Sequence, residues 1–391
     1  MAAESAARFQ ELEDQAARIM GVFARGGYEH VAPSLIQPAD VFLDRIGEAI
    51  RNRTYIFTDP DGVELCLRPD LTIPSCRLYL ERNPAADRQA RYAYNGPAFR
   101  YQRGKPDPSR PREFRQAGLE CFGVADREQA ETEVLALILE ALRIAGLRDF
   151  RLRFGDLGLL RALLGALPIP ERWRERLMHS FWRPESFHAV LHRLAAPAAP
   201  LPDARVAVLA RQLDAGNAEK AEQVVAEYLD VSGITVLGAR TIGEITERLL
   251  AAAADMREQP LAGEVVALVE AYLAISGPPE TALAAIATLA TEAKVDLNQP
   301  IEACRRRYQL FRAANIGLNA AAFDADFGRH FEYYSGFVFQ IEQPGRGVAG
   351  LIAGGGRYDG LLASIGAPRD APAIGSAIHT ERLLAAKEET A

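Results

Sequence analysis

The sequence predicts an α+β fold in which an antiparallel sheet is flanked by helices and interrupted by a helical insertion. Segments with strand character lie before residue 157 and return after residue 318, whereas the stretch between them is rich in Ala, Leu, Glu and Arg at helical spacing. Strands, then helices, then strands again is the order of an α+β protein and not of a parallel α/β sheet. We therefore expect a core made of residues 1–156 and 319–391, with a mainly helical insertion at 157–318.

Local patterns place the first elements of the core. Apolar residues from Phe9 to Phe23 recur at helical spacing, and the glycine pair that follows ends this helix. Two prolines between residues 28 and 43 favour extended chain over a long helix. The stretch VELCLRPD, from Val63 to Asp70, alternates apolar and polar residues and predicts a strand.

The rest of the core follows from the same reasoning. Strands are expected at 93–103 and 114–124, on either side of a basic loop that contains three prolines. Asp126 is placed to cap a helix that runs to about Ala145, and a strand follows at 149–156. After the insertion, strand-like segments recur at 331–342, 348–360 and 371–379, and the last of them runs into a helix.

Composition narrows the class of protein. Apolar residues make up 49% of the 391 residues and charged residues 25%, as in a soluble globular protein, and the net charge of −7 counts against stable binding of a polyanion. Four scattered cysteines without a Cys-x-x-Cys pair favour a reducing cytoplasm over a disulfide framework or a zinc ribbon. The start lacks the pattern of a signal peptide, and no run of 18 apolar residues predicts a membrane span.

Three stretches carry chemistry, although each alone has an ordinary explanation. Arg100, Phe114 and Gln116 surround the basic loop and suit a polyphosphate, but a surface hairpin with solvated charges explains them equally. IAGGGRYDGLL lets backbone approach a ligand or turn a corner, and it is neither a P-loop nor a dinucleotide fingerprint. Arg382, near the end of the chain, suits an anion or a helix salt bridge.

In this order, the stretches together resemble the catalytic domain of class II aminoacyl-tRNA synthetases, and specifically the histidyl branch. The first motif of that class resembles YEHVAPSLIQPADVF, with Pro33 as its proline. The second motif resembles FRYQRGKPDPSRPREFRQAGLECFG, and the third resembles AIHTERLL. RHFEYYSGFVFQ and IAGGGRYDGLL resemble the two histidine-recognition elements of that branch. The resemblance covers about residues 5–155 and 320–390, with the helical block where the branch carries an insertion.

The resemblance implies a role for each matching residue. Arg100 would hold the α-phosphate of ATP, Arg382 would hold the γ-phosphate, and Phe114 would stack on adenine. The implied histidine-binding set is Asp70, Thr72, Gln116, Glu120, Arg329, Tyr333, Tyr334 and Tyr358. A carboxylate such as Glu120 and a hydroxyl such as that of Tyr334 together satisfy both nitrogens of an imidazole. The tyrosines are also compatible with plain core packing.

The pattern departs from that of an active synthetase in several places. Only nine residues follow Arg382, so we expect no anticodon-binding domain. His379 stands where the third motif has a glycine, which places a ring where ATP would lie. Gln102 and Arg115 replace a Glu and a His of the second motif, and Leu71 adds bulk where that branch has glycine.

These departures affect ATP and tRNA binding, whereas the implied histidine set survives. That combination resembles the ATP phosphoribosyltransferase regulatory subunit family, whose members pair with a short catalytic chain for the first step of histidine biosynthesis, under feedback by histidine. The resemblance implies a non-catalytic regulatory subunit without a cofactor, a homodimer inside a hetero-oligomer, and no binding of tRNA or membrane.

Two alternatives remain open. The first is an active, histidine-activating (adenylate-forming) enzyme, which Arg100, Arg329 and Arg382 support. The second is an RNA-binding relative of the synthetases, which the acidic net charge disfavours. A metal site is not expected, because His188 and His192 share helical spacing but have no third ligand nearby in the sequence.

Overall fold

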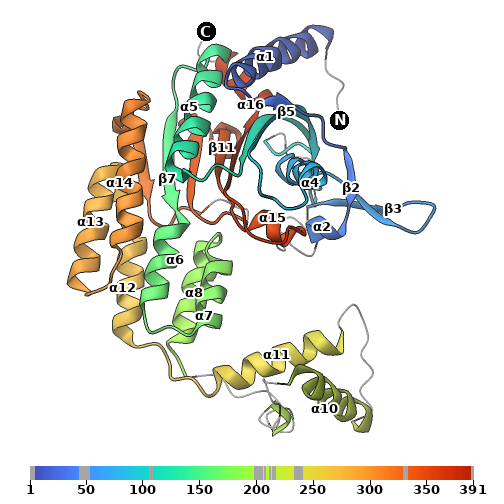
Figure 1. Ribbon diagram of the computed structural model, residues 1–391, viewed down its shortest axis with the longest axis vertical. Helices are drawn as coiled ribbons and strands as arrows, with labels where there is room; N and C mark the ends of the chain where they lie inside the picture. The colour runs from blue at the N-terminus through green and yellow to red at the C-terminus, as the bar shows by residue number, and fades with distance from the viewer. Residues whose placement is uncertain are drawn as a thin grey trace. The chain divides into compact units, whose positions relative to one another are not determined.

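The structure is a computed structural model that describes residues 5–43, 53–104, 107, 109–197, 206, 208–210, 213, 217–232, 241–328 and 333–388. The chain divides into two compact units (Figure 1). The larger unit comprises Met1–Pro168, Phe181–Pro184 and Leu268–Ala391. The smaller unit comprises Ile169–Ser180 and Glu185–Ala267.

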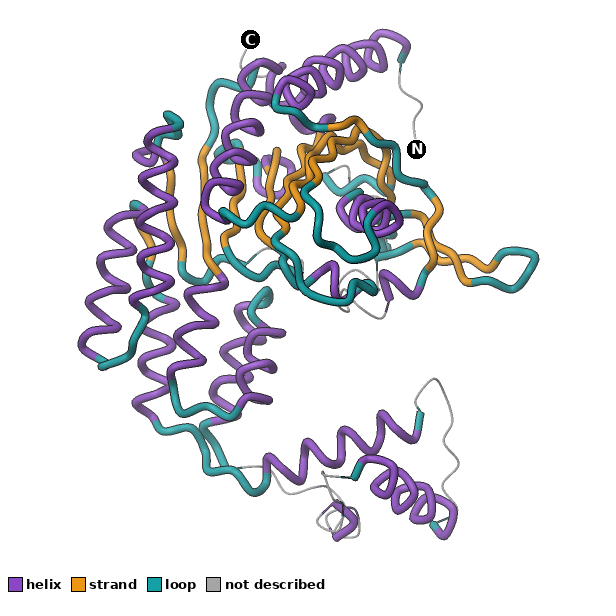
Figure 2. Tube along the Cα trace, in the orientation of Figure 1, coloured by secondary structure: helices purple, strands orange, loops and turns teal. Residues whose placement is uncertain are grey.

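A mainly antiparallel sheet forms the centre of the larger unit, drawn as orange tube in Figure 2. Its nine strands lie in the order β1-β5-β6-β12-β11-β10-β7-β9-β8, and its neighbours are antiparallel except for the parallel pairs β1–β5 and β7–β9. The strands are β1 (Glu29–His30), β5 (Ala90–Phe99), β6 (Glu113–Phe122), β7 (Arg151–Asp156), β8 (Ser276–Gly277), β9 (Ala321–Asp324), β10 (Phe337–Glu342), β11 (Leu351–Arg357) and β12 (Ala373–His379). The predicted α+β class with an antiparallel sheet is confirmed.

Helices cover both faces of this sheet. On one face lie α1 (Ala6–Arg25), α5 (Arg127–Ala145) and α16 (Thr380–Glu388), with α14 (Asn298–Ala313) beside α5. On the other face lies α4 (Thr72–Arg82), whose Tyr79 ring stacks on Phe122 of β6 at 4.5 Å between centroids. We call these the helix face and the α4 face.

The end of α1 and both ends of α5 form where the sequence predicts them. The side chain of Ser5 accepts from the backbone N–H of Arg8 at the start of α1, and Gly26 ends that helix. Asp126 caps α5 by accepting from the N–H of Gln129 at 3.1 Å. Gly146 ends α5 at φ 104°, a left-handed conformation that glycine adopts without steric cost.

Glycines on the α4 face leave room for large polar side chains of neighbouring strands. Gly118 of β6 lies opposite Tyr94 of β5, and a Cβ at that position would lie 2.6 Å from the Tyr94 hydroxyl. Gly375 of β12 lies opposite Glu120 of β6, and its Cβ would lie 1.5 Å from a Glu120 carboxylate oxygen. These strands therefore hold a tyrosine and a glutamate flat against the sheet.

A second, three-stranded sheet in the order β2-β4-β3 belongs to the same unit. Its strands are β2 (Ile36–Pro38), β3 (Tyr55–Thr58) and β4 (Glu64–Leu67), and the short α2 (Asp40–Leu43) follows β2. Ile36 and Phe57 share one face of this sheet by register, and both are exposed in the isolated chain.

The helical stretch between the two parts of the core contributes to both units. From this stretch, the larger unit contains α6 (Leu157–Ala166), α13 (Pro279–Glu292), α14 and the 3-10 turn η1 (Leu318–Ala320). Later in the chain, the larger unit also contains the 3-10 turn η2 (Gly347–Gly350) and the short α15 (Leu361–Ser364). The smaller unit contains α7 (Glu171–Ser180), α10 (Ala218–Val231), α11 (Ile242–Asp255) and most of α8 (Pro184–Leu194), and α12 (Gly263–Leu273) crosses the boundary between the units.

Within the smaller unit, a carboxylate joins two of the helices. Asp255, at the end of α11, accepts from the Trp173 indole N–H and pairs with Arg172 and Arg176, all on α7. Separately, Leu213, Ala221 and Val225 form part of a buried apolar cluster between α10 and the residues before it. No helix among the described residues has the length and apolar character needed to span a bilayer.

Candidate ligand-binding site

A cavity of about 770 Å³ opens in the larger unit. Its floor is the glycine-rich α4 face of the sheet, where Gln116 of β6, Gly354 of β11 and Gly375 of β12 line it. The loop before α4, the residues before β10 and the start of α16 complete the walls. The cavity is lined by acceptors and tyrosines at one end and by arginines at the other.

Two buried acceptors at the first end lack a hydrogen bond. Asp70 lies in the loop between β4 and α4, where its Oδ1 accepts from the N–H of Ile73 at 3.2 Å. Its Oδ2 and the Oε1 of Gln116 are both buried and have no hydrogen-bond partner among the described residues. Burial also raises the pKa of Asp70 above its usual value. Because unsatisfied buried acceptors are costly, this end of the cavity suits a ligand with several N–H donors, such as an ammonium group.

Three tyrosines form an aromatic side of the same end, which we call the tyrosine wall. The rings of Tyr333 and Tyr334 have centroids 4.7 Å apart, and Tyr333 meets the ring of Tyr358 edge-on at 5.8 Å. All three line the cavity. Burial raises the pKa of Tyr333 and Tyr358 far above the ordinary value, so both keep their hydroxyl protons at neutral pH.

Glu120 lies directly behind this wall and is fully buried. Its carboxylate accepts from the hydroxyl of Tyr94 at 3.0 Å and from the hydroxyl of Tyr358, and the side chain of Thr72 also lies beside it. Glu120 is not one of the described residues that line the cavity. Burial raises its pKa to about 7, against the opposing effect of these hydrogen bonds.

Arginines dominate the other end of the cavity, whose lining includes Arg53, Arg100, Arg110, Arg346 and Arg382. The Nε of Arg100 donates to the carbonyl oxygen of Pro69 at 3.0 Å. Arg382 donates to the carbonyl oxygens of Leu351 and Ser109, each at 3.1 Å. Burial, together with Arg53 and Arg382, lowers the pKa of Arg100 to about 10, so that it stays charged at neutral pH. This end is therefore cationic and attracts anions.

Phe114, which the resemblance assigns to adenine, presents little free ring surface. Its side chain is 5% exposed and packs with Leu71 and Tyr94 in an apolar cluster. The guanidinium of Arg100 lies over the ring at 4.7 Å, and the His379 ring lies 5.2 Å from it. Stacking of adenine on Phe114 stays a prediction, and it would require His379 or Arg100 to move.

The structure gathers most of the expected site residues around one cavity. Those that line it are Asp70, Thr72, Arg100, Phe114, Gln116, Tyr333, Tyr334, Tyr358 and Arg382. Arg329 lies outside the described residues. The two residues that depart from the second motif lie in different places. Gln102 lines the cavity, whereas Arg115 pairs with Glu13 of α1 at 2.8 Å on the helix face.

Sequence reasoning missed Tyr94 behind the wall, and Arg53 and Arg346 at the cationic end. A signal for Tyr94 exists, because Gly118 follows Gln116 by two positions in a strand that otherwise carries side chains. A glycine at that place indicates a large neighbour on the adjacent strand.

Comparisons with known proteins agree with this fold and show the family. A model of the histidyl-tRNA synthetase family matches residues 4–239 and 239–383. A protein of Brucella anthropi named ATP phosphoribosyltransferase regulatory subunit is 34% identical over 358 residues, which cover 91% of this chain and 92% of its own. One of the same name from Chelativorans sp. is 34% identical over 381 residues, covering 96% and 97%. The chain belongs to the ATP phosphoribosyltransferase regulatory subunit family.

Two solved structures share the fold of this chain. A Bacillus halodurans protein described as an ATP phosphoribosyltransferase regulatory subunit/histidyl-tRNA synthetase has a TM-score of 0.67 at 20% identity, with 99% of this chain and 81% of that chain covered. A histidine–tRNA ligase subunit from Alicyclobacillus acidocaldarius has a TM-score of 0.60 at 23% identity, with 100% and 96% covered. These two likenesses confirm the class II synthetase fold that the family shares.

Proposed function

We propose that this chain is the regulatory subunit of ATP phosphoribosyltransferase, that it acts in histidine biosynthesis in the cytoplasm, and that it does not itself catalyse the transfer. The family membership supports the role, since relatives that match nearly the whole chain carry that name. The partner in this proposal is a short catalytic chain. Four buried, unpaired cysteines are compatible with a reducing compartment.

The proposed effector is histidine, bound in the cavity of the larger unit. The observation that carries this proposal is the pair of unsatisfied acceptors, Asp70 Oδ2 and Gln116 Oε1, at the end of the cavity that the tyrosine wall closes. An α-ammonium group supplies the donors that these acceptors lack, and the hydroxyls of Tyr334 or Tyr358 suit the imidazole nitrogens. Glu120 would then act on the imidazole through the hydroxyl of Tyr358. It would contact the ring directly only if that hydroxyl moved aside.

The proposed regulation is a linkage effect. Histidine changes the activity of the partner only if it binds differently to the active and inactive states of the complex. The larger the ratio of its two affinities, the larger the change in activity that saturating histidine produces.

The decisive experiment reconstitutes the complex with a short catalytic chain and measures phosphoribosyl transfer to ATP with and without histidine. We expect the single chain to show no transfer, and the complex to be inhibited by histidine. Asp70→Asn keeps the size of the side chain but replaces an acceptor of the ammonium group with an amide. We expect it to raise the inhibitory histidine concentration by about tenfold or more, as loss of a charge-assisted hydrogen bond does.

The control for this variant is Asp61→Asn, in the exposed turn between β3 and β4. It should leave inhibition unchanged. If histidine inhibits the complex with the wild-type chain and the complex with Asp70→Asn equally, the cavity is not the histidine site. Transfer by the purified single chain would remove the regulatory assignment itself.

One observation favours a second candidate, the histidine-activating enzyme. Arg100 and Arg382, which the resemblance assigns to ATP phosphates, both line the cationic end of the cavity. Histidine-dependent exchange between ATP and pyrophosphate distinguishes the two functions. Turnover in that assay would favour the enzyme, and its absence together with activation of the partner would favour the regulatory subunit.

A further inference from the structure

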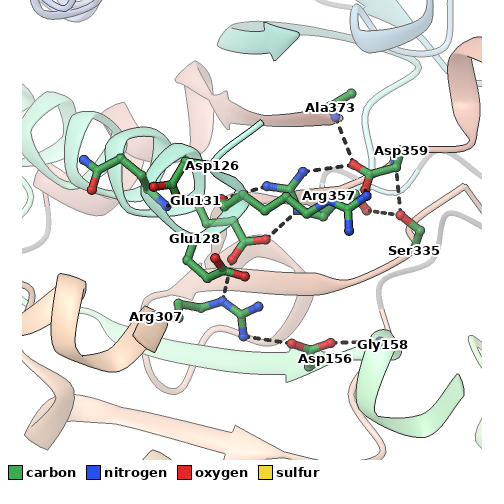
Figure 3. Close-up of polar contacts among 12 residues, drawn as sticks. Asp126, Glu128, Glu131, Asp156, Gly158, Arg307, Ser335, Arg357, Asp359 and Ala373 are labelled. Atoms are coloured by element: carbon green, nitrogen blue, oxygen red, sulfur yellow. Dashed lines mark hydrogen bonds and ion pairs between the residues drawn. The ribbon is translucent and has the colours of Figure 1, made fainter. Parts of the chain in front are cut away.

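A buried charge network lies on the helix face of the sheet, and Figure 3 shows its polar contacts. Its members are Glu131 of α5, Arg307 of α14, Arg357 of β11 and Asp156 at the end of β7, each at most 7% exposed. Glu131 accepts from the Nε of Arg357 with one oxygen and from the Nε of Arg307 with the other, both at 2.5 Å. Arg307 also donates to Asp156 at 2.8 Å. The network thus joins two helices to two strands.

Stability alone does not account for such a network. The cost of removing charges from water offsets most of the attraction between them, so apolar side chains of similar volume often stabilise a core as well. What an ion network adds is direction, because every guanidinium N–H needs an acceptor at a fixed angle. Arg357 meets this need with Glu131, with the carbonyl oxygen of Arg127 at 2.8 Å, and with Asp359 at 2.9 Å.

The first link from this network to the cavity is covalent. Arg357 is the last residue of β11, and Tyr358 follows it directly. Successive side chains of an extended segment point to opposite faces of a sheet. Arg357 therefore reaches Glu131 on the helix face, whereas Tyr358 reaches Glu120 on the α4 face and lines the cavity. Fixing Arg357 fixes the backbone from which Tyr358 projects.

The second link is a set of hydrogen bonds to Ser335, the residue that follows the other two tyrosines. Asp359, which accepts from Arg357, donates its N–H to the Ser335 hydroxyl at 3.0 Å. The N–H of Ser335 donates to the carbonyl oxygen of Arg357 at 2.8 Å. Because Ser335 directly follows Tyr334, these bonds tie the segment that carries both adjacent tyrosines to Arg357. Figure 3 shows Ser335, Asp359 and Arg357 joined in this way.

We propose that Arg357, held by Glu131, is the positioning residue for the tyrosine wall and thereby sets the affinity of the cavity for its amino-acid effector. The inference rests on the proposed function in one respect, since the effector used to test it is histidine. Arg357 does not touch the ligand, and it acts through the backbone of Tyr358 and through Ser335.

The adjacent residue on α14 offers a matched control. Arg306 also pairs with carboxylates near the start of α5, Asp126 at 2.6 Å and Glu128 at 2.5 Å, but it lies at the exposed surface. Among the residues that the structure describes, its hydrogen bonds go to Asp126 and Glu128, and not to β11 or Ser335. Arg306→Gln therefore removes an arginine–carboxylate contact between the same two helices without loosening the tyrosine wall.

The experiment compares Glu131→Gln and Ser335→Ala with wild type and with Arg306→Gln, using full-length chain labelled with 3-fluorotyrosine. The first readout is the fluorine resonance of Tyr358, assigned by its loss in Tyr358→Phe. The second is the dissociation constant of histidine from calorimetry. We expect both test variants to shift the resonance and to weaken histidine binding by about tenfold, and Arg306→Gln to change neither.

An unchanged resonance in folded Glu131→Gln and Ser335→Ala overturns the proposal, and so does a shifted resonance with unchanged affinity. If Glu131→Gln does not fold, Ser335→Ala decides alone, because it removes a single hydroxyl from a partly exposed position. If wild type gives no heat with histidine, the proposed effector is wrong. The resonance then decides the positioning role by itself, with a shift supporting it and no shift overturning it.

Discussion

Glu120 is a carboxyl group that is held away from water between two tyrosine hydroxyls. Tyr94 and Tyr358 each donate to one of its oxygens, and Gly375 leaves the space in which it lies. The hydrogen bonds favour the ionised form, but burial has the larger effect and raises the pKa to about 7. The charge behind the tyrosine wall therefore changes within the range of pH found in cells.

This pKa leads to a test by the pH dependence of stability. The folded chain keeps the Glu120 proton up to about pH 7, whereas the unfolded chain releases it near the ordinary value of 4.5. The contribution of this group to the free energy of unfolding is thus fully present below pH 4.5 and is lost as pH rises towards 7. We expect wild type to lose on the order of 2–3 kcal/mol relative to Glu120→Gln between pH 5 and pH 8.

Urea unfolding at several pH values measures that difference. Glu113→Gln, at the exposed start of the same strand, shows the effect of the same substitution outside the buried cluster. Parallel pH profiles for wild type and Glu120→Gln would contradict the assignment.

Single residues were predictable from sequence where a motif carried them. Gln116 and the three tyrosines lie in stretches that resemble the synthetase motifs, and Asp70 follows from the same resemblance at a separate position. The structure brings them to one cavity. Arg53 and Tyr94 lie outside those motifs. They come close to the cavity only because the turn before β3 places Arg53 there and the folded sheet places Tyr94 there. The position of Glu120 behind Tyr358 was not predictable either. It depends on whether the Glu120 carboxylate or the Tyr358 hydroxyl lies nearer the opening of the cavity.

At the scale of elements, the pairing of β6 with β12 explains why the cavity has a flat floor. Glu120 faces Gly375 across this pair and Gly118 faces Ala377, so each of these two pairs contains a small residue that leaves space on the floor of the cavity. Side chains directly opposite in an antiparallel pair lie close enough to compete for space. The glycines therefore fix where the polar side chains of the site can lie.

Substitution of Gly375 by alanine tests this arrangement. The new methyl group would lie 1.5 Å from a Glu120 oxygen, so the carboxylate must shift and lose its tyrosine partners. We expect Gly375→Ala to destabilise the chain by about 2 kcal/mol or more. In the double variant with Glu120→Ala, the total loss should be smaller than the sum of the single losses.

Chemical denaturation provides the four free energies of this cycle. Gly317→Ala serves as the control, since a Cβ there has no heavy atom within 4 Å and the glycine has ordinary backbone angles. Additive losses in the cycle would show that the two residues do not compete for space.

Elements were predictable wherever a periodic pattern met a clear start or stop signal. The glycine pair after α1 marked the end of that helix and Asp126 marked the start of α5, and the structure confirms both. The helical block was harder, because periodicity shows that one side of a helix becomes buried but not which partner covers it. α14 packs beside α5 of the sheet unit, whereas α10 and α11 belong to the smaller unit.

At the scale of the whole molecule, the β2-β4-β3 sheet suggests how copies of the chain associate. Ile36 and Phe57 are 50% and 38% exposed on one face of this sheet, within or next to the stretch that resembles the first synthetase motif. We propose that two copies form a homodimer through this face. Burial of apolar surface is the main driving force for such association.

The double substitution Ile36→Lys with Phe57→Lys should weaken that dimer. We expect sedimentation velocity to show a shift towards monomer at micromolar concentration, because lysine charges on both sides of a symmetric contact repel each other. Val231→Lys, at an 88% exposed apolar position on α10, should leave the oligomeric state of wild type unchanged. A dimer that survives the double substitution would place the contact on another face.

The strand order of the large sheet has a consequence for how the chain folds as it leaves the ribosome. β12, at residues 373–379, lies between β6 and β11, although β6 is complete some 250 residues earlier. Until β12 arrives, β6 and β11 both present unpaired backbone edges, and such edges recruit strands from other chains. The central sheet of a nascent chain therefore stays in two pieces until β12 has been synthesised, and chaperones that shield exposed edges should raise the yield.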